Sequence, residues 1–209
     1  MKNIFIYILV LFISANYVLA QHSENFPFGV GPFVTLKGGV NAASVPSGIK
    51  NDFTINGLPD FGATGYIPLT EKSHLGLAVD LAYSSYFYDN KHTNASDNWT
   101  SQASYITLGP NLYVSGFIIG LNFGLPLSIK AKLPPYYYNF DNKTSDLAFM
   151  VEVRLGGMIP LYYNEFGRLT LIIQGGYFLT GQMTNLTNYN PHPASGSIGI
   201  GYIFNLQQN

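Results

Sequence analysis

Large apolar side chains occupy every second position from Phe117 to Ile129, and mostly glycine or polar residues stand between them. A period of two is that of a β-strand with two unlike faces. The stretch is also more than twice as long as an average strand of ~5–6 residues. It therefore predicts a long strand with one face against a continuous apolar environment.

The same alternation recurs along the chain and predicts eight strands. They cover approximately residues 30–41, 60–69, 74–84, 102–114, 117–129, 146–161, 168–181 and 197–206. Long polar segments (42–59, 88–101, 130–145 and 182–193) alternate with short turns (70–73, 115–116 and 162–167). Such alternation, with an even strand count, is what an up-and-down barrel requires. We expect a bulge or a local strand edge at Pro110 and Pro126, because proline cannot donate to a ladder.

Alternation alone fits a soluble β-sandwich or a lipocalin-like barrel as well as a membrane barrel, since each has one apolar face. Charged residues make up 10% of the chain, whereas an average soluble domain has ~25%. Inward-pointing apolar faces would therefore leave an outer surface with too few charges. If the apolar faces point outward, they meet lipid, and small polar residues fill a lumen that in a barrel of ~8 strands is just wide enough for side chains.

Four charged residues lie near the middle of predicted strands, at positions that point away from the apolar face. They are Lys37, Asp80, Glu152 and Arg154. A cation on the lipid face near the midplane costs roughly 2–4 kcal/mol, so we expect all four side chains in the lumen. Two acids and two bases predict a self-neutralising, structural network, since charges in a dry interior need partners. A gated path for ions or protons is the alternative.

Aromatic residues gather near both ends of the predicted strands, among them Tyr88, Trp99 and Tyr113. They predict the two aromatic belts with which a membrane barrel meets the lipid interfaces. The predicted fold class is therefore all-β, an eight-stranded antiparallel up-and-down transmembrane β-barrel.

The first 20 residues have the pattern of a secretory signal peptide. Lys2 is followed by the apolar run 4–13 and by small residues that end at Ala20, after which we expect cleavage. Residues 21–209 then form the barrel domain. The alternative is an anchoring helix, but such a helix needs ~20 apolar residues, and Ser14 and Asn16 interrupt the run.

Composition excludes several kinds of chemistry. The chain has no cysteine, which removes disulfides, thiol catalysis, thiolate metal sites and an acylated-cysteine anchor. A net charge of −1 provides no field for nucleic acid. The four histidines do not have metal-ligand spacing. We therefore predict no cofactor, no metal and no nucleic-acid partner.

One cluster offers a catalytic hypothesis. His92 lies close in sequence to Asp89, Ser96 and Asp97, and histidine with serine and a carboxylate can form a catalytic triad. Polar loops produce such clusters by chance, so we predict that the protein is not an enzyme. We expect a structural protein, or one that binds a ligand or a protein partner through its long loops. A narrow pore and an outer-leaflet lipid-modifying enzyme are the alternatives.

Three glycine-rich segments carry a family resemblance. They are Gly-Val-Gly-Pro-Phe-Val-Thr-Leu-Lys-Gly-Gly-Val-Asn at 29–41, Gly-Tyr-Ile-Pro-Leu-Thr-Glu-Lys-Ser-His-Leu-Gly-Leu at 65–77 and Gly-Ile-Gly-Tyr-Ile-Phe at 199–204. With the signal peptide, these resemble the small outer-membrane β-barrel domain family of Bacteroidetes-type bacteria, the PorT-like group. The resemblance implies a barrel in outer-membrane lipid with both termini in the periplasm, and no catalytic residues. A partner could bind the long loops or the periplasmic turns, in a secretion or envelope complex.

Overall fold

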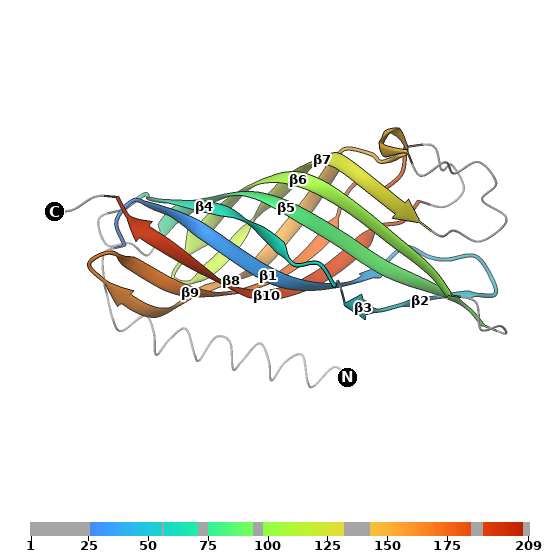
Figure 1. Cartoon of the computed structure of the whole chain (residues 1–209), viewed down its shortest axis with the longest axis horizontal. Helices are drawn as coiled ribbons and strands as arrows, with labels where there is room; N and C mark the ends of the chain where they lie inside the picture. Colours follow the sequence, from blue (N-terminus) through green and yellow to red (C-terminus); the bar gives the residue numbers. More distant parts are fainter. Residues whose placement is uncertain are drawn as a thin grey trace.

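The computed structural model describes residues 26–55, 57–70, 75–93, 98–131, 143–184 and 190–206. These residues form an antiparallel β-barrel whose strands are tilted against its long axis (Figure 1). The predicted signal peptide, residues 1–20, lies outside the described residues. No helix in the described part of the chain is long and apolar enough to cross a membrane.

Eight long strands make up the wall. They are β1 (Gly29–Asn41), β4 (Asp60–Pro68), β5 (Leu75–His92), β6 (Asn98–Val114), β7 (Phe117–Ala131), β8 (Met150–Asn164), β9 (Gly167–Phe178) and β10 (Pro193–Asn205). Each pairs with its neighbour in the chain, and β1 pairs with β10 from Gly29↔Asn205 to Asn41↔Pro193, which closes the ring. The predicted strand number and up-and-down order are confirmed.

Three short elements complete the described chain. The strands β2 (Ile49–Asp52) and β3 (Thr54–Ile55) lie in the predicted loop 42–59, and the 3-10 helix η1 (Thr144–Asp146) precedes β8. The connections β6–β7 and β8–β9 are tight turns, at Ser115–Gly116 and Glu165–Phe166. We call the end with these turns the short-turn end and the opposite end the long-loop end.

The prediction of a long loop at residues 88–101 is wrong. The ladder between β5 and β6 continues from Tyr88↔Ser101 to Lys91↔Asn98, so both strands extend far beyond the apolar alternation. The reason is physical, because a hydrogen-bonded ladder outside the lipid needs no apolar outer face, and its outward positions carry polar residues such as Asp89 and Lys91.

The orientation of the two faces follows the prediction. Leucines such as Leu36, Leu81 and Leu155 are exposed on the outside, whereas Thr107 and Asn122 are buried in the lumen. A closed ring with an apolar outside and a polar inside leaves no unpaired strand edge in the lipid, which is the architecture of outer-membrane β-barrels. The outer face of this chain is a lipid-contacting surface.

A bulge interrupts the strand that first indicated the fold. Tyr105 pairs with Pro126 but Ser104 pairs with Ser128, so Leu127 is an extra residue in β7. Beyond it the alternation is inverted, and Ile129 is buried in the lumen rather than facing lipid. The expected irregularity is confirmed at Pro126, whereas the register of β6 against β7 is the same on both sides of Pro110.

The aromatic belts are only partly as predicted. Phe166 at the short-turn end and Phe149 at the long-loop end are exposed on the outside. Tyr88, Trp99 and Tyr113 instead are buried inside the barrel, because each lies at a position of its strand that faces the lumen. They contribute to filling the lumen rather than to the lipid interface.

Candidate functional site: a sealed luminal charge layer

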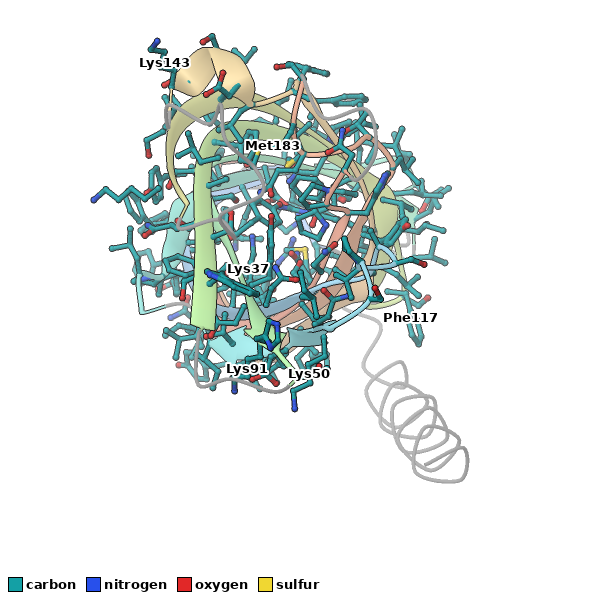
Figure 2. All side chains as sticks on the ribbon, turned by 90° about the vertical axis from the view of Figure 1, so that its right-hand side faces the viewer. Lys37, Lys50, Lys91, Phe117, Lys143 and Met183 are labelled. Carbon is teal, nitrogen blue, oxygen red and sulfur yellow. The ribbon has the colours of Figure 1, made fainter. Side chains whose placement is uncertain are left out.

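Six charged side chains are buried among the described residues. They are Lys37, Asp60, Asp80, Glu152, Arg154 and Arg168. Three acids and three bases give a neutral set, which includes the four residues expected from the sequence. Figure 2, which looks into the long-loop end, shows Lys37 inside the ring of strands, with Lys50 and Lys91 at its outside.

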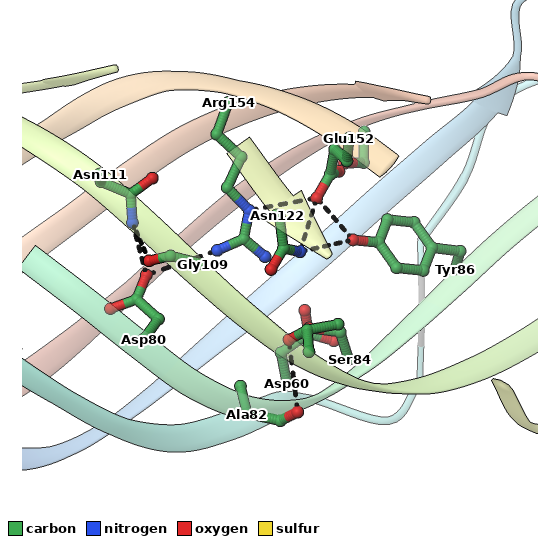
Figure 3. A network of polar contacts seen from close by, with 12 residues as sticks. Asp60, Asp80, Ala82, Ser84, Tyr86, Gly109, Asn111, Asn122, Glu152 and Arg154 are labelled. Carbon is green, nitrogen blue, oxygen red and sulfur yellow. Dashed lines mark hydrogen bonds and ion pairs between the residues drawn. The ribbon is translucent and has the colours of Figure 1, made fainter. Parts of the chain in front are cut away.

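Arg154 connects two carboxylates in the middle of the lumen (Figure 3). It lies two residues from Glu152 on β8, so strand alternation directs both side chains to the same face. The Nε of Arg154 donates to Glu152 Oε2 at 3.1 Å, and its Nη1 donates to Asp80 Oδ2 at 3.4 Å. Asp80 also accepts from Asn111 Nδ2 at 3.2 Å. The guanidinium thus joins β8 to β5 across the interior.

Glu152 is the residue on which most of these bonds converge. Its Oε2 accepts hydrogen bonds from the Tyr86 hydroxyl at 2.7 Å and from Asn122 Nδ2 at 2.9 Å. Its Oε1 accepts from Ser195 Oγ at 3.4 Å. With only 1% of the residue exposed, the carboxylate has exchanged water for donors of four other residues, as a buried charge requires.

Lys37 and Asp60 form a second ion pair beside the first group. Asp60 Oδ1 accepts a further bond from the backbone N–H of Ser85 at 2.9 Å. The Nζ of Lys37 lies 3.8 Å from the centroid of the Tyr86 ring, a cation–π contact. Since the Tyr86 hydroxyl donates to Glu152, this one tyrosine links both groups into a single network.

Two of the six charges are additional to the sequence prediction. Asp60 is the first residue of β4 and Arg168 the second of β9, so both stand at a strand end, whereas the sequence prediction considered only charges near the middle of strands. Their signal is the exposed or half-buried apolar residue that follows each of them, Phe61 and Leu169, because alternation then directs the charge inward.

Arg168 lies apart from the network, at the short-turn end. Its guanidinium carbon is 4.2 Å from the ring centroids of both Phe26 and Tyr66. Phe26 precedes β1 and also meets Tyr163 edge-on, at 6.0 Å between centroids. The cation is thus held between aromatic rings, which links the N-terminal segment to the barrel interior.

Apolar clusters close the lumen on both sides of the charges. At the short-turn end the cluster comprises Tyr66, Ala78, Tyr113, Ile118, Met158 and Ile203, with Phe26 packed against it. At the long-loop end it comprises Tyr86, Ala103, Tyr105, Ile129, Leu147, Met150, Phe178 and Met183. The charged residues between these two clusters form what we call the sealed charge layer.

A small cavity remains inside this layer. Its lining includes Lys37, Asp60, Ser84, Glu152 and Arg154. It offers ≈ 10 Å³ to the centre of a water molecule, which is room for about one water. The centre of the barrel is therefore filled by side chains.

The described residues do not form the catalytic arrangement that the sequence suggested around His92. Asp89 and His92 occupy positions of β5 that point to opposite faces, and His92 packs edge-on against Trp99 with 6.2 Å between ring centroids. Ser96 and Asp97 lie outside the described residues. Within the part of the chain that is described, no group of three or more His, Cys, Asp or Glu residues is placed to hold a metal ion.

Comparison with known proteins finds solved structures that are similar to this chain. No family model matches the sequence, and no curated protein matches it. The chain is similar to the outer membrane protein AlkL, solved by solid-state NMR in DMPC lipid bilayers, with a TM-score of 0.45, 12% identity and coverage of 89% of this chain and 94% of that chain. The assignment to a membrane β-barrel rests on the chain's own geometry.

Two further solved structures are similar. The crystal structure of the outer membrane protein OprG from Pseudomonas aeruginosa has a TM-score of 0.37 and 13% identity, and the match covers 86% of this chain and 98% of that one. The translocator domain of the autotransporter NalP from Neisseria meningitidis has a TM-score of 0.31 and 10% identity, with 93% and 95% covered.

Proposed function

We propose that this chain is a non-catalytic protein of the bacterial outer membrane that binds a ligand or a protein partner at its long-loop end. In this proposal the barrel is a rigid, closed support, and residues 1–20 direct export and are removed. The single observation that carries the proposal is the sealed charge layer, because a lumen filled in this way offers no route for solutes.

The energetics of the charge layer argue for a closed barrel. A passing ion would have to separate Arg154 from its carboxylates or Lys37 from Asp60. Breaking a buried pair costs about 3–5 kcal/mol, because it leaves an uncompensated charge in a medium of low polarity. The clusters on either side add a second barrier, since both consist of closely packed, buried side chains. We therefore assign the network a structural role.

The long-loop end supplies an ordered surface for binding. The ladder of β5 and β6 continues beyond the exposed Leu81 and Ile106 to Lys91↔Asn98, and in Figure 1 the two strands reach toward the right-hand, long-loop end. The bridge between Leu147 and Met183 holds the segments before β8 and after β9 together, and η1 lies beside them. A surface with such preformed elements binds without a large ordering cost.

The finer assignment concerns the PorT-like group and its setting. The resemblance of segments 29–41, 65–77 and 199–204 favours this family, and we propose accordingly that the partner belongs to a secretion or envelope complex. Crosslinking of a tagged chain in intact cells, followed by identification of the captured proteins, tests this assignment. Capture of no protein at the long-loop end or the short turns would contradict it.

Conductance in planar lipid bilayers tests the closed lumen. We expect the purified, folded protein to give no steady single-channel openings. The double variant Tyr105→Ala/Phe178→Ala is the positive control, because it removes two large rings from the long-loop cluster and should raise the leak. Openings of the unmodified protein that change when Arg154 is replaced by Gln, but not when the exposed Lys130 is, would establish the narrow pore instead.

A further inference from the structure

The wall between β1 and β5 contains an interruption that no neighbouring strand shows. The descending segment from Ile49 to Pro68 pairs with β5 as β2, with β1 as β3 and with both as β4. Between the pairs Gly38↔Ile55 and Thr35↔Asp60, β1 has two residues, whereas the descending segment has four, 56–59. Of these four, residues 57–59 are described and belong to no strand.

This segment carries three large apolar side chains on its outer side. Phe53 is 59% exposed, Ile55 69% and Leu58 42%. A Cβ added at Gly38 would overlap the ring of Phe53, so this ring covers an outward-facing position of β1. We call Phe53, Ile55 and Leu58 the rim patch. These residues are unusual in the segment 42–59, whose polar composition predicts a solvated loop.

The surroundings of the rim patch define its depth relative to the lipid. Directly toward the membrane lie Leu36, exposed on β1, and Phe61, which stacks on Tyr83 with 5.3 Å between ring centroids. Both belong to the lipid-contacting face of the barrel. The rim patch therefore extends the apolar outer surface of the barrel beyond Leu36. On the outer side of β1, no polar residue lies between Leu36 and the rim patch.

On the opposite side of the rim patch the outer surface becomes charged. Lys50 stands across from Lys91, and Asp52 across from Asp89. The side chain of Lys91 forms an ion pair with Asp52. The hydrogen bond from Lys91 lowers the pKa of the Asp52 carboxyl, which is ionised at neutral pH. Charged side chains on the lipid side belong at or beyond the headgroups. The rim patch thus lies at the boundary between hydrocarbon and headgroups.

We propose that the rim patch is a membrane anchor, with Phe53, Ile55 and Leu58 inserted among the lipids of the outer leaflet. The occupant of this surface is lipid because the patch is continuous with the lipid-contacting face and ends where charges begin. The first long loop is then held against the membrane, and the binding surface proposed above is left to the other loops. The anchor does not depend on that function, since its test involves neither conductance nor a partner.

Fluorescence quenching by brominated phospholipids tests the anchor. The background is Trp99→Phe, which removes the single tryptophan of the chain, and Phe53→Trp introduces the probe. Leu36→Trp is the membrane control, and Lys130→Trp, on the exposed long-loop part of β7, is the aqueous control. Each variant is folded into phosphatidylcholine vesicles whose acyl chains carry bromine near the carbonyl end.

We expect the Phe53→Trp probe to lose at least half as much emission as the Leu36→Trp probe, and to be protected from iodide added to the water. Quenching below half of that value, with iodide access equal to that of Lys130→Trp, would overturn the anchor. Ile55→Trp repeats the measurement at a second position, and only variants with a heat-modifiable band on gels are compared, so a folding defect cannot mimic either outcome.

Discussion

At the scale of single residues, Glu152 shows how this barrel keeps a charge away from water. The carboxylate accepts bonds from Tyr86, Asn122, Arg154 and Ser195. Glycine makes the space for it, because a Cβ at Gly176 would overlap the Glu152 carboxylate. The charge is therefore compensated by its neighbours and enclosed by them.

Replacing Glu152 by Gln tests this arrangement. We expect a loss of about 3–5 kcal/mol in the free energy of unfolding, because Arg154 would be left without its closest carboxylate. The measurement is urea unfolding of the protein in phospholipid vesicles, followed by the fluorescence of Trp99. Glu165→Gln, in the exposed turn between β8 and β9, is the matched control and should change stability by less than ~0.5 kcal/mol.

A double-mutant cycle with Arg154→Met separates the pair from its surroundings. Because both residues belong to one network, the double variant should lose clearly less free energy of unfolding than the sum of the losses of the two single variants. Additive losses, or a loss for Glu152→Gln as small as that for Glu165→Gln, would show that the network does not stabilise the barrel.

At the scale of elements, the pairing of β1 with β10 decides whether the sheet becomes a barrel. The two strands approach closely at Gly31, where a Cβ would overlap the carbonyl oxygen of Tyr202. At Gly65 on β4, in contrast, the nearest atom to an added Cβ is the Val79 carbonyl oxygen at 3.9 Å. The same substitution should thus have different effects on the closing strand pair and on an interior one.

Gly31→Ala should destabilise the barrel by about 1–3 kcal/mol, because the backbone of the closing pair has to shift to admit the methyl group. Gly65→Ala should leave stability unchanged or raise it slightly, since it reduces the freedom of the unfolded chain. The folded fraction on unheated gels after refolding into vesicles measures both variants. Equal folded fractions would contradict a specific close approach at the closing pair.

Strand length was the property of the elements that the sequence predicted least well. The alternation of apolar residues ends near Ser84 on β5, but the strand continues to His92. Hydrophobic periodicity records the part of a strand that borders lipid. Backbone pairing continues in water without an apolar outer face, and the sequence pattern carries no comparable signal for it.

At the scale of the whole molecule, closure of the ring makes the fold resistant to detergent. Each of the eight long strands pairs with two others, and the pairing of β1 with β10 closes the ring. Opening such a ring requires the loss of a complete strand pairing, which is why a closed barrel persists in detergent until it is heated.

The chain should fractionate with the outer membrane and migrate differently on gels before and after boiling. The control is a variant that ends at residue 192 and lacks β10, which cannot pair with β1 and should show a single band. Recovery of the full chain as a soluble periplasmic protein, without a heat-modifiable band, would contradict the membrane barrel.

The sequence alone determined the strand number, the up-and-down order and the inward direction of Lys37, Asp80, Glu152 and Arg154. These properties follow from a period of two residues, which is local to the backbone. Only the tertiary structure decided which charges meet: Arg154 reaches Asp80 over 74 residues and Tyr86 reaches Glu152 over 66. Such contacts depend on the stagger of distant strands and on bulges such as the one at Leu127, and neither leaves a periodic signal in the sequence.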